Sequence, residues 1–181
     1  MKLEEAQAYA NKVVEAIRDL CDRIEVAGSI RRKKKEVNDI DIVAIPKYIQ
    51  AKSPLGTTIS YGPSETWRER IPGVLMCLPL KLLGHAFGSE LMRLSFRENG
   101  LQVDIYRARP ETWGILLLVR TGSIEHNMKL CNIAKSKGLK LSASQGVVTQ
   151  AGFGEIIASN TEEEIFAALG LPYIDPRNRE V

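Results

Sequence analysis

Residues 24–46 read IEVAGSIRRKKKEVNDIDIVAIP, and this stretch decides the fold. Its two apolar runs, 24–27 and 39–45, are rich in β-branched residues and predict two strands, the second of which ends at Pro46. Between them, a Gly28-Ser29 turn leads into a basic segment, 30–36, that we expect to begin as a helix. Strand, turn, helix start and strand in close succession indicate a mixed α/β unit.

Three aspartates are placed to project from a sheet. Asp39 and Asp41 are two residues apart on one predicted strand, so both point to the same face. Asp104 lies on a later predicted strand and shares its face with Gln102 and Tyr106. At roughly 4 Å two carboxylates repel each other by about 4 kcal/mol at an effective dielectric constant near 20, so three together require cations. Oxygen ligands without a nearby His or Cys favour Mg²⁺ or Mn²⁺.

The Gly28-Ser29 turn has the groups that bind a phosphate chain. It offers free backbone amides and a hydroxyl, and the guanidinium groups of Arg31 and Arg32 follow directly. A triphosphate held there beside a pair of metal ions predicts an in-line phosphoryl displacement, in which two ions stabilise the attacking and the leaving oxygens.

Each of these features has an ordinary structural interpretation when it is taken alone. Two aspartates spaced by one residue on a strand are common by chance, and a run such as 31–35 is usually a solvated charged face. Asp104 alone would be an edge-strand charge or an ion-pair partner. Only their combination in this order favours the catalytic interpretation.

Composition excludes several classes of protein. The 181 residues are 44% hydrophobic and 26% charged with a net charge of +3, which is ordinary for a globular protein. The three cysteines, Cys21, Cys77 and Cys131, form no CxxC pair, so a zinc ribbon or disulfide scaffold is not expected. We find no signal peptide or membrane span, and expect a cytoplasmic protein, with a nucleoid-associated or viral setting left open.

The remaining elements follow from periodicity and turn residues. A helix is expected over 3–22, and Asn99-Gly100 predicts a hairpin between strands 91–96 and 101–106. Residues 48–71 allow a short helix around 64–70 or an irregular connection. Helices over 111–120 and 123–137, a strand pair within 139–149 and a helix opened by a capping box at Thr161 complete the pattern. We expect two domains, 1–109 and 110–181.

These motifs resemble the family X DNA polymerases, the group of DNA polymerase beta. The nucleotidyltransferase motif of that family is similar to residues 28–32 followed by 38–42, and its third-aspartate strand is similar to residues 102–105. Residues 121–123 with 125–127 resemble the turn and helix that meet the incoming nucleotide. Residues 137–142 and 170–174 resemble the carboxy-terminal sheet and end of the family.

The resemblance implies a mixed α/β (α+β) nucleotidyltransferase palm followed by a small α+β subdomain that selects the nucleotide. It implies the minimal two-subdomain form, without the lyase and helix-hairpin-helix domains. The implied reaction is DNA-directed addition of a dNMP to a primer 3′-hydroxyl with two Mg²⁺ or Mn²⁺ ions, in short-gap repair. The implied partners are a dNTP and primer-template or gapped DNA, with no membrane, and the protein is expected to act as a monomer.

The resemblance also assigns roles to single residues. Asp39, Asp41 and Asp104 would be the catalytic, metal-binding residues, with Asp104 orienting the 3′-hydroxyl. The substrate-binding residues would be Gly28, Ser29 and Arg32 for the phosphates, Thr121 and Gly122 for the sugar, and Asn127 for the base. Lys33, Lys34, Lys35 and Lys129 would contact DNA, and Lys135, Lys137 and Lys140 extend the basic stretch around Lys129.

Three positions depart from the family pattern. Val119-Arg120 stands where aromatics guard the sugar, Gln102 stands where Arg is common, and residues 142–146 replace an Asn-x-Tyr-Gly stretch. Two alternatives therefore stay open: a small nucleotidyltransferase acting on another acceptor, and a non-catalytic module that binds DNA ends.

Overall fold

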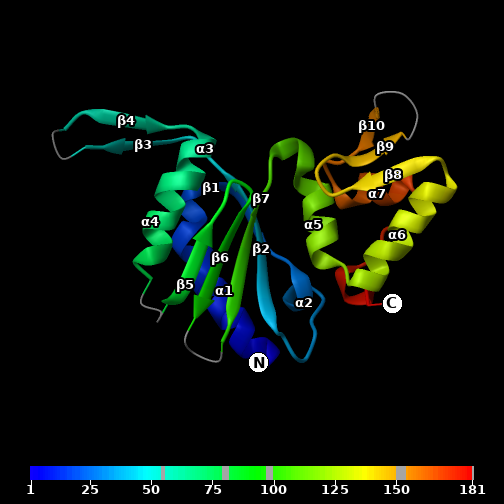
Figure 1. The fold of residues 1–181 in the computed structure, drawn as a ribbon, viewed down its shortest axis with the longest axis horizontal. Coiled ribbons are helices and arrows are strands. Elements are labelled where there is room, and N and C mark those ends of the chain that lie inside the picture. The colour runs from blue at the N-terminus through cyan, green and yellow to red at the C-terminus, as the bar shows by residue number, and fades with distance from the viewer. Residues whose placement is uncertain (54–55, 79–81, 97–99, 150–153, 181) are drawn as a thin grey trace. The chain divides into compact units, whose positions relative to one another are not determined.

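The computed structural model of the chain describes residues 1–53, 56–78, 82–96, 100–149 and 154–180. They pack into two compact units (Figure 1). The first contains Met1–Val26 and Lys35–Arg107, and the second contains Ala27–Lys34 and Ala108–Val181. The basic segment after the Gly-Ser turn thus packs with the second unit, although the strands on either side of it belong to the first. The division into domains 1–109 and 110–181 stays a prediction.

The first unit is built on a five-stranded sheet in the order β1-β2-β7-β6-β5. The strands are β1 (Cys21–Val26), β2 (Asp39–Pro46), β5 (Leu82–Phe87), β6 (Leu91–Phe96) and β7 (Gln102–Arg107). Strands β2 and β7 are parallel, and every other neighbouring pair is antiparallel. The predicted strands 24–27, 39–45, 91–96 and 101–106 are confirmed to within a few residues. Of the predicted hairpin turn, Asn99 lies outside the described residues.

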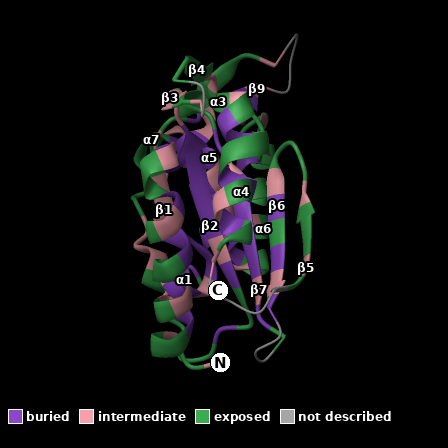
Figure 2. Cartoon of the chain, turned by 90° about the vertical axis from the view of Figure 1, so that its left-hand side faces the viewer, coloured by how far each residue is buried: buried purple, intermediate pink, exposed green. Residues whose placement is uncertain are grey.

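Helix α1 (Leu3–Ile17) covers one face of this sheet, and a 3₁₀ turn (Arg18–Leu20) follows it. The predicted helix 3–22 is therefore too long, because Cys21 already pairs with Pro46 in the β1–β2 ladder. Ala6, Ala10, Val13 and Ile17 form the buried stripe of the helix, each with 0% exposure. Figure 2 shows this stripe against the buried strands. Because the apolar side chains of the strands face α1, the aspartates that alternate with them lie on the other face of the sheet.

Residues 47–78 form elements that the sequence left unassigned. Strands β3 (Ile49–Lys52) and β4 (Thr58–Tyr61) pair as a separate ribbon that extends from the rest of the first unit in Figure 1. A helical stretch follows: α3 (Pro63–Glu65), a π-helical turn (Thr66–Arg70) and α4 (Ile71–Met76). Trp67 anchors this stretch, because it is fully buried and its Nε1 donates to the Gly88 carbonyl at 2.9 Å.

The second unit combines helices with a three-stranded sheet in the order β10-β9-β8. Its elements are α2 (Gly28–Arg31), a 3₁₀ turn (Pro110–Thr112), α5 (Trp113–Thr121), α6 (Ile124–Ser136), β8 (Leu139–Ser142), β9 (Gly146–Thr149), β10 (Ile156–Ala158), α7 (Glu162–Ala168) and a 3₁₀ turn (Pro176–Asn178). The helices predicted at 111–120 and 123–137 and the strand pair within 139–149 are confirmed. Thr161 caps α7 as expected, since its hydroxyl accepts from the Glu164 amide at 3.1 Å.

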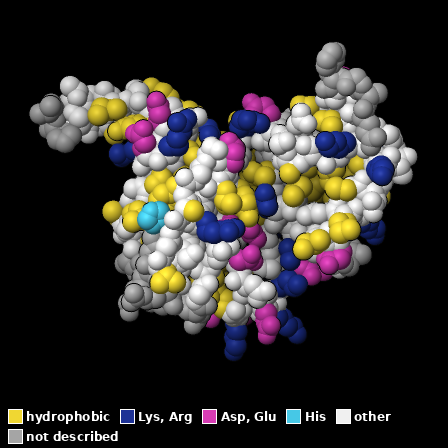
Figure 3. Space-filling view, in the orientation of Figure 1, with side chains coloured by type: hydrophobic (Ala, Val, Ile, Leu, Met, Phe, Trp, Pro, Cys, Tyr) yellow, Lys and Arg dark blue, Asp and Glu magenta, His cyan; other side chains and the backbone are white. Residues whose placement is uncertain are grey.

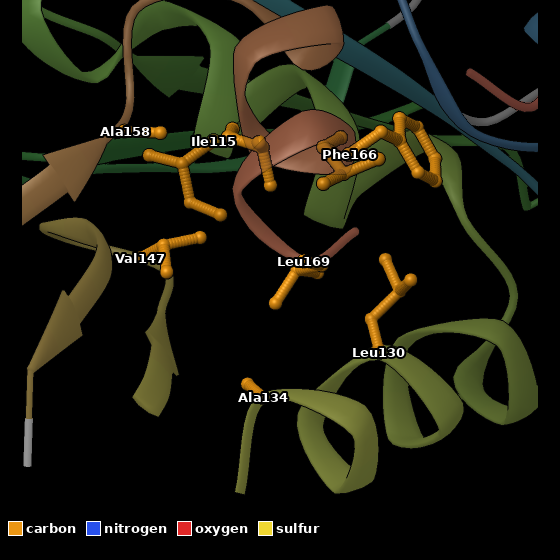
Figure 4. Close-up of a cluster of buried hydrophobic side chains, with 9 residues drawn as sticks. Ile115, Leu130, Ala134, Val147, Ala158, Phe166 and Leu169 are labelled. Atoms are coloured by element: carbon orange, nitrogen blue, oxygen red, sulfur yellow. The ribbon is translucent and has the colours of Figure 1, made fainter. Parts of the chain in front are cut away.

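The core of the second unit lies between α5, α6, α7 and the small sheet. Ile115, Leu130, Val147, Phe166 and Leu169 point toward one another in Figure 4 and are at most 1% exposed. Gly114 permits the close approach of α5 to the start of α7, because a Cβ there would lie 2.4 Å from the backbone of Thr161. The mixed α/β fold class is confirmed. In the described part of the chain, no helix has both the length and the apolar character needed to span a membrane.

Candidate active site

The sheet register brings two of the predicted aspartates side by side. In the parallel β2–β7 pair, Asp41 is the direct partner of Asp104, and Asp39 is the partner of Gln102. The residues that alternate with them, Ile40, Ile42, Val103 and Ile105, are fully buried on the opposite face. The apolar face therefore holds the acids on the other face of the sheet in this register.

Asp104 is the most enclosed of the three acids, with an exposure of only 3%. Arg93 on β6, its direct partner in the antiparallel β6–β7 pair, donates from Nε to Oδ1 at 2.8 Å and from Nη2 to Oδ2 at 2.7 Å. Gln102 Nε2 and the Tyr106 hydroxyl each donate to Oδ2 at 3.3 Å. The hydrogen bonds with Asp104 raise the pKa of Arg93 above its usual value. The sequence analysis missed Arg93.

The three aspartates offer the ligand atoms that a divalent cation prefers, but they do not form a metal-ligand group in the described part of the chain. Carboxylate oxygens are the ligands that Mg²⁺ and Mn²⁺ prefer. Within the described ranges, however, no three Asp, Glu, His or Cys side chains are grouped closely enough to hold a metal ion. Asp39 is exposed at the start of β2, and the carboxylate of Asp104 is occupied by Arg93.

The Gly28-Ser29 turn opens helix α2 in the second unit. Gly28 has a φ of +57°, which favours glycine at this position. The Ser29 hydroxyl is buried and has no hydrogen-bond partner among the described residues. A buried hydroxyl without a partner costs free energy, so this atom is suited to a ligand or a water molecule.

The two arginines after the turn are bound to protein groups. Arg31 donates to both carboxylate oxygens of Glu162 at 2.8 Å and to the Thr121 hydroxyl at 2.9 Å. Arg32 donates to the Glu180 carboxylate and to the Thr121 carbonyl, and Lys34 Nζ lies 3.0 Å from Glu180. Lys33 and Lys35 are exposed. In this arrangement Arg32 can reach a phosphate only if its contacts rearrange.

A buried ionic cluster centres on Glu162. The side chain of Arg179 is fully buried and also donates to Glu162, and Tyr173 adds its hydroxyl at 3.4 Å. The Arg179 guanidinium lies over the ring of Phe166 at 5.3 Å. Burial acts to raise the pKa of Glu162, but the hydrogen bonds from Arg31 and Arg179 outweigh it and hold the pKa below its usual value. The cluster links α2 to α7, whose residues lie 131 apart in sequence.

The corner between α5 and α6 contains the residues predicted to line the nucleotide. Thr121 is buried, and a Cβ on Gly122 would lie 2.5 Å from Asn127 Oδ1, so a larger residue there would displace the Asn127 side chain. Asn127 Nδ2 donates to the Val119 carbonyl at 2.8 Å, while its Oδ1 is buried without a partner among the described residues. Asn127 therefore ties the corner together. Lys129, two residues further along α6, is exposed.

His126 gives this corner a pH-dependent stability. Burial, reinforced by the cations of Arg179, Lys129 and Arg32, lowers the pKa of His126 to about 4. A neutral buried histidine must become charged on unfolding in acid, so stability is lost as the pH falls from 6.5 toward 4. We expect urea denaturation to show a loss of about 2 kcal/mol between pH 7 and pH 5.

Two variants test this assignment. His126→Phe should remove most of the pH dependence, whereas replacement of the exposed His85 by Phe should leave it in place. An unfolding free energy in the unmodified protein that is the same at the two pH values would contradict the buried neutral state.

Comparison with known proteins adds an independent finding. The family model of the DNA polymerase beta thumb matches residues 116–180. Rat DNA polymerase lambda is 34% identical over 89 residues, covering 44% of this chain and 15% of that protein. The DNA polymerase/3′-5′ exonuclease PolX of Bacillus subtilis is 29% identical over 154 residues, covering 85% of this chain and 24% of that protein. The chain thus spans less than a quarter of the length of these curated relatives.

Two solved structures of Leishmania infantum polymerase beta have the same fold. The ternary primer-template complex has a TM-score of 0.78 at 20% identity, covering 100% of this chain and 77% of that chain. The ternary gap complex has a TM-score of 0.79 at 19% identity, covering 100% and 71%. The thumb match over residues 116–180, the two curated relatives and the shared fold agree with the motifs of the sequence, and the chain is similar to the family X DNA polymerases.

Proposed function

We propose that the chain is a DNA-directed DNA polymerase that adds a dNMP to a primer 3′-hydroxyl in short-gap repair. The observation that carries this proposal is the register of the sheet, which pairs Asp41 with Asp104 on the face that also bears Asp39. In the reaction a bond forms between the 3′-oxygen and the α-phosphorus. The bond from that phosphorus to the β-phosphate bridging oxygen breaks, and pyrophosphate leaves while the hydroxyl loses its proton.

Asp39, Asp41 and Asp104 would hold two Mg²⁺ or Mn²⁺ ions, which family X polymerases generally use. Bound ions would stabilise the charge that develops on the attacking and leaving oxygens. Asp104 would orient the 3′-hydroxyl from its enclosed position on β7. The chain contributes mainly positioning and electrostatic stabilisation.

The second unit would bind the nucleotide. Its triphosphate would meet the amides of Gly28 and Ser29, and the unpartnered Ser29 hydroxyl supports this assignment. Arg32 would join the phosphates after exchanging its contact with Glu180. Thr121 and Gly122 would lie at the sugar, and Asn127, whose Oδ1 lacks a partner, would approach the base.

DNA would be held through phosphate contacts of exposed lysines, and the protein would act as a monomer. Lys33, Lys35, Lys129, Lys135, Lys137 and Lys140 are exposed. Figure 3 shows Lys and Arg side chains at the surface of each unit. The titles of the two Leishmania structures name primer-template and gap complexes, which supports duplex DNA as the partner.

Salt dependence tests the lysine contacts. If about five lysines meet phosphates, the logarithm of the association constant should fall with the logarithm of salt concentration at a slope of about −4 to −5. Replacing Lys129, Lys135, Lys137 and Lys140 together by Ala should reduce this slope by about 3 to 4. Lys12→Ala on α1 is the control. A slope near zero in the unmodified protein would rule out these contacts.

Primer extension tests the reaction itself. The purified chain is mixed with a labelled primer on a gapped template, Mg²⁺ or Mn²⁺, and single dNTPs or NTPs. Template-matched extension is the expected result, and the NTP lanes report whether Val119-Arg120 admits ribose. Extension that ignores the template would identify a terminal transferase. If no extension occurs with either ion, the proposal is overturned in favour of another acceptor or a module that binds DNA ends.

A further inference from the structure

Arg93 completes a row of charges across three strands. On the acidic face of the sheet, Asp41 on β2 is paired with Asp104 on β7, which is paired with Arg93 on β6. The neighbours of Arg93 along β6, Met92 and Leu94, are fully buried on the other face, so the backbone of Arg93 is fixed in this register. One guanidinium therefore stands permanently within reach of the central carboxylate.

The two partners of this ion pair differ in their freedom to move. The Asp104 side chain is 4% exposed, whereas the Arg93 side chain is 46% exposed. Arginine loses little by turning into water, because its head group stays hydrated while its stem lies on the sheet. If the pair separates, Arg93 is the member that moves.

The surface beside Arg93 can receive the displaced side chain. An open cavity of about 530 Å³ lies beside Arg93, and its lining includes Arg93, Ala86 and Glu90. Ala86 is the partner of Arg93 on β5, and its small side chain leaves the space open. Glu90 is exposed and offers a second carboxylate to the guanidinium. Arg93 lies on Asp104 in the structure, and the cavity that it shares with Glu90 gives its side chain room to move.

A cation at Asp104 would compete with Arg93 for the same oxygens. A carboxylate has about four lone-pair sites. Arg93 takes one on each oxygen, and Gln102 and Tyr106 both donate to Oδ2. Oδ2 already accepts three hydrogen bonds, so a cation that binds both carboxylate oxygens must displace the Arg93 contact.

We infer that Arg93 is a positioning residue that holds the Asp104 carboxylate in the metal-free protein and turns toward Glu90 when a divalent cation binds. This inference rests on the metal site of the proposed function and assigns its metal-free state. Arg93 balances the repulsion between Asp41 and Asp104 until the cation replaces it. The protein can in this way keep the buried carboxylate oriented before its metal arrives.

Mn²⁺ binding to the free protein tests the exchange without any nucleotide transfer. Free Mn²⁺ is measured by electron paramagnetic resonance in the absence of DNA and nucleotide. Arg93→Met, which keeps the length and removes the charge, should bind Mn²⁺ about tenfold more tightly than the unmodified chain, a change of about 1.4 kcal/mol. Arg93→Lys should lie between them. Arg68→Met, an exposed arginine of the same unit, should have no effect.

Two further variants test whether the change in Mn²⁺ affinity depends on Asp104 and on Glu90. Adding Asp104→Asn to Arg93→Met should remove the gain in affinity, because the competition is for that carboxylate. Glu90→Gln, which keeps Arg93 but weakens its second position, should lower the affinity for Mn²⁺ two- to threefold. This exposed substitution also tests the inference if Arg93→Met fails to fold.

The outcomes separate this inference from the proposed function. An Mn²⁺ affinity that is unchanged or weaker in folded Arg93→Met, or a gain that survives Asp104→Asn, would overturn the exchange. A tenfold gain in a protein that extends no primer would support the exchange and reject the polymerase. If the chain extends a primer but Arg93→Met leaves the Mn²⁺ affinity unchanged, the polymerase is supported and the exchange is rejected.

Discussion

We expect Asp104→Asn to lower the rate of the proposed dNMP transfer by about 10³-fold or more and to leave dNTP binding within a few-fold. The reason is that the substitution removes one negative charge from the centre of the acidic row while keeping the size of the side chain and its place between Asp41 and Arg93. Electrostatic stabilisation of this kind contributes several kcal/mol to a transition state, which corresponds to such a factor. Single-turnover primer extension measures the rate, and fluorescence titration with a labelled dNTP measures binding.

The matched control for this substitution is Asp22→Asn on β1. Asp22 is an exposed aspartate of the same sheet, so its replacement should leave the rate unchanged. Full activity in Asp104→Asn would remove Asp104 from the catalytic group. A parallel loss of dNTP binding would instead indicate a general effect on folding.

We expect Glu162→Gln to lower the stability of the protein by about 3–5 kcal/mol, because it leaves the fully buried Arg179 and the partly buried Arg31 without their anion. Glu162 is 4% exposed and is the common acceptor of Arg31 and the fully buried Arg179. For a chain of this size we expect the melting temperature to fall by roughly 10 °C. Differential scanning calorimetry measures the change, and Glu163→Gln, at the exposed neighbouring position, is the control. A change below 2 °C would show that the cluster contributes little.

The Glu162 cluster and His126 lose their contributions to stability in different pH ranges. The pKa of Glu162 is held below its ordinary value of 4.5, so its contribution is complete above that pH and is lost as the pH falls through the lower value. The contribution of His126 is lost earlier, between pH 6.5 and about 4. A plot of the free energy of unfolding against pH should therefore show two separate losses of stability. Glu162→Gln should remove only the more acidic one.

The acidic face of the sheet could be predicted because alternation is a local signal. Asp41 and Asp104 each stand between apolar residues that are buried, Asp39 precedes the buried Ile40, and that pattern assigns the faces without any knowledge of the partners. The parallel pairing of β2 with β7 could not be predicted from this local alternation. Those strands are joined by a long connection that includes an exposed ribbon, where alternation is too weak to identify strands.

Arg93 escaped prediction because of the register of one hairpin. A two-residue Asn99-Gly100 turn would place Ser95 opposite Asp104. In the structure Phe96 donates its amide to the Leu101 carbonyl at 2.9 Å, so four residues lie between the strands and Arg93 takes that place. The Glu162 cluster escaped for a different reason, since its partners on α2 and α7 are too distant in sequence for any local pattern to connect them.

The assignment of residues 27–34 to the second unit restricts how this protein can be divided or recombined. A gene cut between Arg107 and Ala108 would separate Glu162 from Arg31, and a chimera exchanged at that point would combine an arginine from one parent with a glutamate from the other. Fragment complementation or exchange between relatives must therefore transfer the octapeptide 27–34 together with residues 108–181. The residues that must be exchanged together are discontinuous in sequence, so a single crossover cannot transfer them intact.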